Sequence, residues 1–281
     1  MSQITAQLVR DLREKTGAGM MDCKKALSAT DGDFEAAVDH LRKQGLKTAD
    51  KKAGRTTGEG RVFSKISADG ASGSMVAVSC ETDFVARTPD FDAYLEALSA
   101  HVLEHGSDNV ETLLGQPWAA GGTVEDGLKT LIGKLGENIQ IADVQCCKVE
   151  GGRIVAYVHH DQKKGALVGL ATGAEAAQVD EVGKSLCMHI VVYSPAGLDR
   201  DAIDAETIER ERAIFREEVK GKPEEIQDKI INGKLEKFYA ERVLTEQPWV
   251  LDDKMSVQKA LEKALGSGTK IAAMKRFEVG S

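Results

Sequence analysis

The order of hydrophobic patterns along the chain restricts its fold more than any other feature of the sequence. Residues 61–80 read as a strand, a Gly-rich turn and a second strand, and a helical pattern follows from Pro89. The same order returns after Gly152, with two alternating runs in residues 153–171 and then a helix that contains Leu186. Consecutive strands joined by short turns pair antiparallel and bury one face under helices. We therefore predict an α+β fold with two antiparallel-sheet/helix subdomains.

The beginning of the chain has a different pattern. Residues 1–45 read as three short helices, which predicts a small three-helix domain. Each helical pattern follows a capping residue, namely Thr5, Asp22 and Asp33, and glycines at Gly17 and Gly45 end the first and third helices. Residues 46–60 are polar and are predicted to form a linker.

A charged segment interrupts the second half of the chain. Residues 199–243 contain ten Lys or Arg and thirteen Asp or Glu, with only a sparse apolar stripe. Pro223 follows Gly221 and is placed to open a new helix. This pattern predicts two antiparallel helices that protrude as a hairpin arm and serve as a spacer or an interaction surface.

These patterns together predict the domain boundaries. The expected parts are a three-helix partner-binding domain (1–45), a linker (46–60), a core N-subdomain (61–142), a core C-subdomain (143–198 and 244–281) and a helical hairpin arm (199–243). A further helix is expected from Thr123 to Leu135, with a capping-box spacing to Asp126 and a stop at Gly136.

Charge and cysteine usage exclude several classes of protein. The chain has 281 residues, 37 Lys or Arg and 45 Asp or Glu, so its net charge of −8 argues against general nucleic-acid binding. Residues 1–60 carry +2 and the rest −10, and the basic side chains between Arg42 and Arg55 fit either a solvated helix end or a surface for an acidic partner. Five cysteines without a CxxC motif, no secretory signal and no membrane-length apolar run predict a cytoplasmic protein with reduced thiols.

The sequence contains no recognisable reaction centre. No phosphate-binding glycine loop and no nucleophile elbow is present. His159, His160 and Asp161 form the one cluster that suggests metal ligation, but two adjacent histidines on a strand are expected to diverge. We therefore expect no metal site, no cofactor and no enzymatic chemistry.

Two short stretches do not fit a purely structural interpretation. Met20 and Met21 stand beside glycines in an expected interhelical loop, where they either cover a small core or form an adaptable protein-binding surface. Asp83 and Phe84 follow a strand and precede the Thr88 helix cap. Either Phe84 packs inward while Asp83 is solvated, or both side chains project toward another protein.

At these two stretches the sequence resembles the family of bacterial translation elongation factor Ts, the guanine nucleotide exchange factors of elongation factor Tu. The resemblance rests on TGAGMMDCKKAL (16–27) and TDFVAR (82–87), and it continues through KLGENI, GKPEEI, QPWV and RFEVG. It implies a ubiquitin-associated-like three-helix domain, a two-part α+β core and a protruding helical hairpin. Members of the family often continue past RFEVG into a C-terminal helix that contacts the partner, so we expect that contact to be absent in a sequence ending at Ser281.

The resemblance also implies a role for particular residues. Asp83 and Phe84 would enter the partner's GTPase domain near its magnesium site, and His159 would contact the partner near its phosphate-binding loop. The remaining implied contacts are Met20, Met21, Lys24, Leu135 and Gly136 with the GTPase domain, and Val250 and Leu251 with the partner's other domains.

The function implied by this resemblance is release of GDP from elongation factor Tu, so that GTP can bind again. Two alternatives stay open at this point: a passive adaptor that binds a GTPase without changing nucleotide release, and a metal-dependent enzyme using His159, His160 and Asp161. Weak self-association through the helical hairpin is a further possibility.

Overall fold

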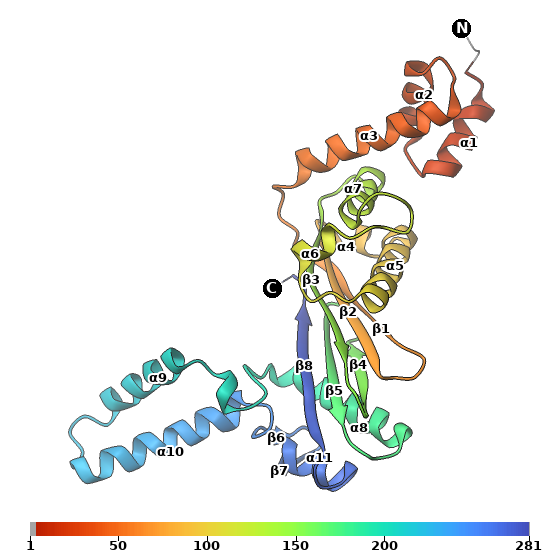
Figure 1. The fold of residues 1–281 in the computed structure, drawn as a ribbon. Coiled ribbons are helices and arrows are strands. Elements are labelled where there is room, and N and C mark those ends of the chain that lie inside the picture. Colours follow the sequence, from red (N-terminus) through yellow and green to blue (C-terminus); the bar gives the residue numbers. More distant parts are fainter. Residues whose placement is uncertain (1–3, 281) are drawn as a thin grey trace. The chain divides into compact units, whose positions relative to one another are not determined.

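The computed structural model describes residues 4–280, which form two compact units (Figure 1). One unit contains the chain up to Lys65, residues 74–146 and the chain from Phe277 onward, and the other contains residues 66–73 and 147–276. The α+β class predicted from the sequence is confirmed, with helices and separate small sheets in the described chain. The finer division into a linker and two subdomains stays a prediction.

The first three helices form a bundle with its own small core. They are α1 (Ala6–Thr16), α2 (Met20–Ala29) and α3 (Phe34–Lys52). Thr5 and Asp33 cap α1 and α3 as predicted, and Gly17 ends α1 in a left-handed conformation with φ 67°. The core contains Leu12 and Leu27, both fully buried.

Three local predictions in this region were wrong. The N-cap of α2 is Gly19, so Met20 and Met21 begin the helix instead of lying in a loop, and Asp22 lies in its first turn. Gly45 does not end α3, which continues to Lys52 through the first part of the expected linker. The prediction for Gly45 failed because this glycine allows close packing inside the helix and does not end it. A Cβ added to Gly133 would lie only 2.8 Å from the Cα of Gly45. Gly45 is therefore a point of close helix approach.

The first sheet and its helices form the main core of the first unit. The sheet has the order β1 (Glu59–Ile66), β2 (Ser72–Cys80) and β3 (Ile139–Lys148). Its helices are α4 (Asp83–Ala86), α5 (Pro89–His105), α6 (Val110–Leu114) and α7 (Val124–Leu135). Thr88 caps α5, and the predicted capping box between Thr123 and Asp126 opens α7. The predicted apolar face of α5 is fully buried, at Phe91, Leu95, Leu98 and Val102.

The second unit contains a sheet of order β4 (Gly152–Val158), β5 (Lys164–Ala171) and β8 (Lys270–Glu278). β4 and β5 are antiparallel, in a register that runs from Gly152 opposite Ala171 to Val158 opposite Gly165. The helices α8 (Ala176–Tyr193) and α11 (Val257–Leu265) contribute to the core of this unit. A short hairpin of β6 (Pro248–Trp249) and β7 (Asp252–Ser256) precedes α11.

The predicted helical hairpin is present in the second unit. After a short 3-10 turn (Arg200–Ala202), α9 (Ala205–Glu218) and α10 (Glu224–Arg242) lie side by side (Figure 1). Val219, Ile231 and Leu235 form a small buried cluster between them. The segments by which the chain enters and leaves this arm lie side by side, because the backbone N–H of Leu244 donates to the carbonyl of Gly197 at 2.9 Å.

The residues that the structure describes contain neither a membrane-spanning helix nor a metal-binding cluster. Within residues 4–280, no helix has the length and apolar character needed to cross a membrane. The same part of the chain contains no group of three or more His, Cys, Asp or Glu side chains that could hold a metal ion.

Candidate functional site

The Asp83–Phe84 pair projects from a short helix whose other side is anchored. Phe84 is 81% exposed, whereas Val85 and Ala86 next to it are buried in the core of the first unit. Thr82 is the N-cap of this helix, and its hydroxyl accepts from the N–H of Val85. The interpretation in which Phe84 packs inward is therefore wrong, since the core position belongs to Val85.

The carboxylate of Asp83 is also accessible. Its side chain is 45% exposed and lies 3.2 Å from the guanidinium of Arg87, one helical turn further on. Exposed ion pairs of this kind contribute about 0–1 kcal/mol, so a partner can replace Arg87 at small cost. Asp83 and Phe84 thus present a charged group and an aromatic ring together.

Residues 81–82, just before this helix, are hydrogen-bonded to residues 137–138, which are distant in sequence. The carboxylate of Glu137 accepts from the backbone N–H of Thr82 at 3.0 Å and from its hydroxyl at 2.6 Å. In return, the carboxylate of Glu81 accepts from the backbone N–H of Asn138 at 2.6 Å. Carboxylates that accept from N–H groups make strong, directional bonds. These reciprocal bonds hold the segment that follows Leu135 and Gly136 at the N-terminal end of the Asp83–Phe84 helix.

The pKa shifts of Glu81 and Cys80, at the base of the Asp83–Phe84 helix, are consistent with these hydrogen bonds. The N–H of Asn138 holds the pKa of Glu81 below its usual value, with a smaller contribution from Arg55. Burial of Cys80 raises the pKa of its thiol to about 12, so this cysteine stays protonated and chemically inert. These segments therefore have a structural carboxylate but no activated nucleophile.

The methionines of α2 lie on the surface of the three-helix bundle. Met20, Met21 and Lys24 are all exposed, and none of them belongs to the bundle core. The alternative in which the two methionines cover that core is wrong. The loop before α2 lies beside the end of α7, because a Cβ added to Gly17 would meet the side chain of Lys134.

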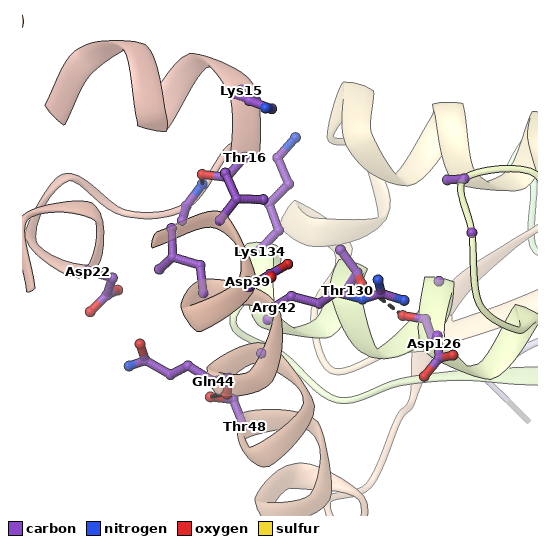
Figure 2. A pocket seen from close by; sticks show the side chains of 18 of the residues that line it. Lys15, Thr16, Asp22, Asp39, Arg42, Gln44, Thr48, Asp126, Thr130 and Lys134 are labelled. Carbon is purple, nitrogen blue, oxygen red and sulfur yellow. Dashed lines mark hydrogen bonds between the residues drawn. The ribbon is translucent and has the colours of Figure 1, made fainter. Parts of the chain in front are cut away.

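A cavity of about 490 Å³ lies between α3 and α7, within the first unit. Figure 2 shows Arg42 of α3 extending toward Thr130 and Asp126 of α7. The lining mixes charges of both signs, from Lys15, Arg42 and Lys134 to Asp22, Asp39 and Asp126. Asp126 is already used as the capping-box acceptor for the N–H of Thr123. The cavity therefore lacks the arrangement of an activated acid, base or nucleophile that defines a reaction centre.

The second unit contains the other three predicted contacts. His159 follows the end of β4, and its Nδ1 lies 3.0 Å from the hydroxyl of Tyr157. The expectation that His159 and His160 diverge was wrong, because both lie after the strand and their ring centroids are 4.2 Å apart. Val250 and Leu251 form the turn between β6 and β7, with Val250 packed on the core and Leu251 69% exposed.

Sequence reasoning missed the residues that position the site. Thr82 could have been identified as a helix cap from its place before DFVA, which is a local signal. Glu137 could not, because its partner Thr82 is 55 residues away and a polar residue after a helix stop has many possible partners.

The site and fold describe a class of protein that acts through contacts with another protein. Exposed side chains project from anchored helices and turns, and among the described residues no cluster of His, Cys, Asp or Glu could hold a metal ion.

The comparisons with known proteins identify the family. A family model described as "Elongation factor TS" matches residues 81–281. Three proteins named elongation factor Ts align with nearly the whole chain. The one from Clostridium botulinum (strain Alaska E43 / Type E3) is 42% identical over 99% of this chain and 93% of the relative. The one from Prosthecochloris aestuarii (strain DSM 271 / SK 413) is 41% identical over 100% of both chains, and the one from Gluconobacter oxydans (strain 621H) is 44% identical over 100% of this chain and 93% of the relative. The chain belongs to the elongation factor Ts family.

Family membership decides between the functions left open by the sequence. The chain is a translation elongation factor that exchanges the nucleotide on elongation factor Tu, and it catalyses no covalent chemistry. The cytoplasmic location expected from the sequence is that of this family of translation factors.

Proposed function

We propose that Asp83 and Phe84 carry the exchange activity by entering the GTPase domain of elongation factor Tu beside its magnesium and phosphate site. The observation that supports this is the exposure of Phe84, 81%, on a helix anchored by its neighbours Val85 and Ala86. Because the backbone that carries the ring is already fixed, insertion costs only the ordering of the Phe84 side chain and not that of a flexible loop.

The proposed mechanism is a thermodynamic coupling between two ligands of the partner. Mg²⁺ requires near-ideal octahedral geometry, so a carboxylate and a ring that disturb its surroundings weaken nucleotide binding. By linkage, bound nucleotide weakens the binding of the exchange factor by the same factor. GDP therefore leaves a transient ternary complex, and GTP then displaces this chain.

The other predicted residues are proposed to hold the partner in place. The GTPase domain would be contacted by two groups of residues: Met20, Met21 and Lys24 on α2, and Leu135 and Gly136 at the end of α7. His159 would contact the partner near its phosphate-binding loop. Val250 and Leu251 would contact its other domains. The exposure of Met20, Met21 and Leu251 supports these assignments.

The test is release of a fluorescent GDP from preloaded elongation factor Tu by catalytic amounts of this protein. We expect Phe84→Ala to slow release at least about tenfold, while its unfolding free energy changes by no more than about 0.5 kcal/mol, as for other exposed positions. The matched control is Val85→Ala, which removes a buried neighbour and should cost roughly 2 kcal/mol of stability.

The outcomes separate the proposal from its alternatives. A Phe84→Ala variant that still binds the partner but no longer accelerates release would assign Phe84 to the exchange step and not to binding alone. Full exchange activity in Phe84→Ala, or a loss of several kcal/mol of stability in that variant, would remove Phe84 from the proposed role.

We also propose weak self-association through the helical hairpin. Ile214 on α9 and Ile226 on α10 are both exposed apolar side chains, which supports a contact there. Sedimentation at increasing protein concentration should show association that Ile226→Ser reduces. A sedimentation coefficient independent of concentration would contradict this.

A further inference from the structure

Large exposed apolar side chains are few in this protein, and their positions are informative. Among the residues that the structure describes they are Met20, Met21, Phe84, Val192, Tyr193, Ile214, Ile226 and Leu251. Four of these are partner contacts under the proposed function, and two lie on the hairpin arm. Only Val192 and Tyr193 have no assigned role. Adjacent exposed apolar residues of this kind mark interaction surfaces more often than scattered single ones do.

The end of α8 explains why these two side chains are exposed. Leu186, Ile190 and Val191 of this helix are buried in the core of the second unit. Ser194 then adopts a left-handed conformation with φ 45° and ψ 58°, and its N–H donates to the carbonyl of Ile190. A non-glycine residue in this region of backbone space ends the helix abruptly. Val192 and Tyr193 therefore stay on the last turn, 65% and 47% exposed.

The ring of Tyr193 is nevertheless held in place by stacking on buried rings. Its ring stacks on His189 with centroids 4.6 Å apart, and His189 stacks in turn on Trp249 at 5.6 Å. The Nε2 of His189 lies 2.9 Å from the side-chain oxygen of Gln247, whose amide donates to the carbonyl of Glu241 at 2.8 Å. Because each ring rests on the next, Tyr193 is positioned before any partner arrives.

The same stack connects Tyr193 to a proposed contact. Trp249 is the last residue of β6, and the β6–β7 turn that follows it consists of Val250 and Leu251. Leu251 is 69% exposed, so it is accessible as Val192 and Tyr193 at the end of α8 are. The second unit therefore presents exposed apolar side chains at both ends of one row of stacked rings.

We propose that Val192 and Tyr193 form, together with Leu251, one contact surface for elongation factor Tu outside its GTPase domain. The inference rests on the proposed function, because it extends the contact assigned to Val250 and Leu251. The complementary surface on the partner is apolar, because Val192, the ring of Tyr193 and Leu251 present mainly apolar area. Tyrosine suits such a site because it buries a large ring at the cost of few rotatable bonds and keeps a polar end.

The experiment measures by titration the affinity of this 281-residue chain for nucleotide-free elongation factor Tu. We expect the double variant Val192→Ser/Tyr193→Ser to bind about tenfold more weakly, with the maximal rate of GDP release unchanged at saturation, since Asp83 and Phe84 are untouched. Tyr193→Phe should keep wild-type affinity within about twofold. The matched control is Ile214→Ser, which alters a side chain as exposed as Tyr193, 47% in both cases. It lies on the hairpin arm, so it should weaken self-association without changing the affinity for elongation factor Tu.

A second measurement does not depend on the folding of a variant. Oxidative footprinting of the wild-type protein, alone and in the complex, should show Tyr193 protected by the partner, whereas Ile214 should remain reactive. Equal reactivity of Tyr193 in both states would overturn the proposal.

The remaining outcomes are also decisive. Wild-type affinity in the double variant would overturn the inference while leaving exchange activity intact. A double variant that changes only the self-association of this chain would assign the surface to a second copy and equally overturn it. Failure of the wild-type protein to release GDP would instead contradict the proposed function itself.

Discussion

At the scale of single residues, neighbouring side chains in this protein have opposite tasks. Phe84 is exposed and Val85 is buried, although both are large and apolar. The helix that contains them is only four residues long, so each position points in a different direction. Burial of Val85 stabilises the fold, and exposure of Phe84 leaves it available for the partner.

His189 gives a prediction at this scale. Burial lowers the pKa of this imidazole from its usual value of about 6.5, and the hydrogen bond with Gln247 opposes the shift only in part. Below about pH 6.5 the unfolded chain therefore binds a proton more readily than the folded one, and stability falls as the pH drops. The stabilisation is complete above about pH 6.5.

The measurement is the unfolding free energy in urea at pH 7.5 and pH 5.5. The wild-type protein should lose more stability over this interval than His189→Gln, by no more than about 1.4 kcal/mol per pH unit. An identical pH dependence in both proteins would show that other groups are responsible.

At the scale of elements, a pair of glycines sets how closely α3 and α7 approach. A Cβ on Gly133 would lie 2.8 Å from the Cα of Gly45, which no real packing tolerates. A Cβ on Gly45 would meet its nearest neighbours at 3.8 Å and 4.0 Å, which is ordinary contact. The two positions face each other but are not equivalent.

The corresponding alanine variants should therefore differ in sign. Gly133→Ala must separate the two helices and should destabilise the protein by roughly 1–3 kcal/mol, the usual cost of overpacking. Gly45→Ala adds helix propensity without a clash and should be neutral or stabilising by up to about 1 kcal/mol. Urea unfolding of both variants measures this, and an equal loss in both would refute the asymmetry.

At the scale of the whole molecule, the hairpin arm is an independent addition to its unit. Its buried cluster is separate from the core of the second unit. The chain leaves at Gly197 and returns at Val243, which are joined in a parallel bridge. The ends of the arm are thus already held together by backbone hydrogen bonds.

Replacement of residues 200–241 by a short Gly-Ser linker should therefore leave a folded protein. We expect GDP release within about threefold of wild type, because the exchange residues lie outside the arm. Self-association should disappear in the same variant. Circular dichroism and the GDP-release assay measure these results, and an unfolded product would show that the second unit depends on the arm.

The sequence by itself determined the α+β class, the order of the longer helices and of the main strands, several helix caps and the family, because these depend on local periodicity and short motifs. It also singled out Asp83 and Phe84, but it could not tell whether Phe84 was core or surface. Only the tertiary structure decided that, because burial depends on which neighbour occupies the core. The same holds for the continuation of α3 past Gly45 and for the Thr82–Glu137 bonds. Both are created by segments distant in sequence, whose approach no local pattern encodes.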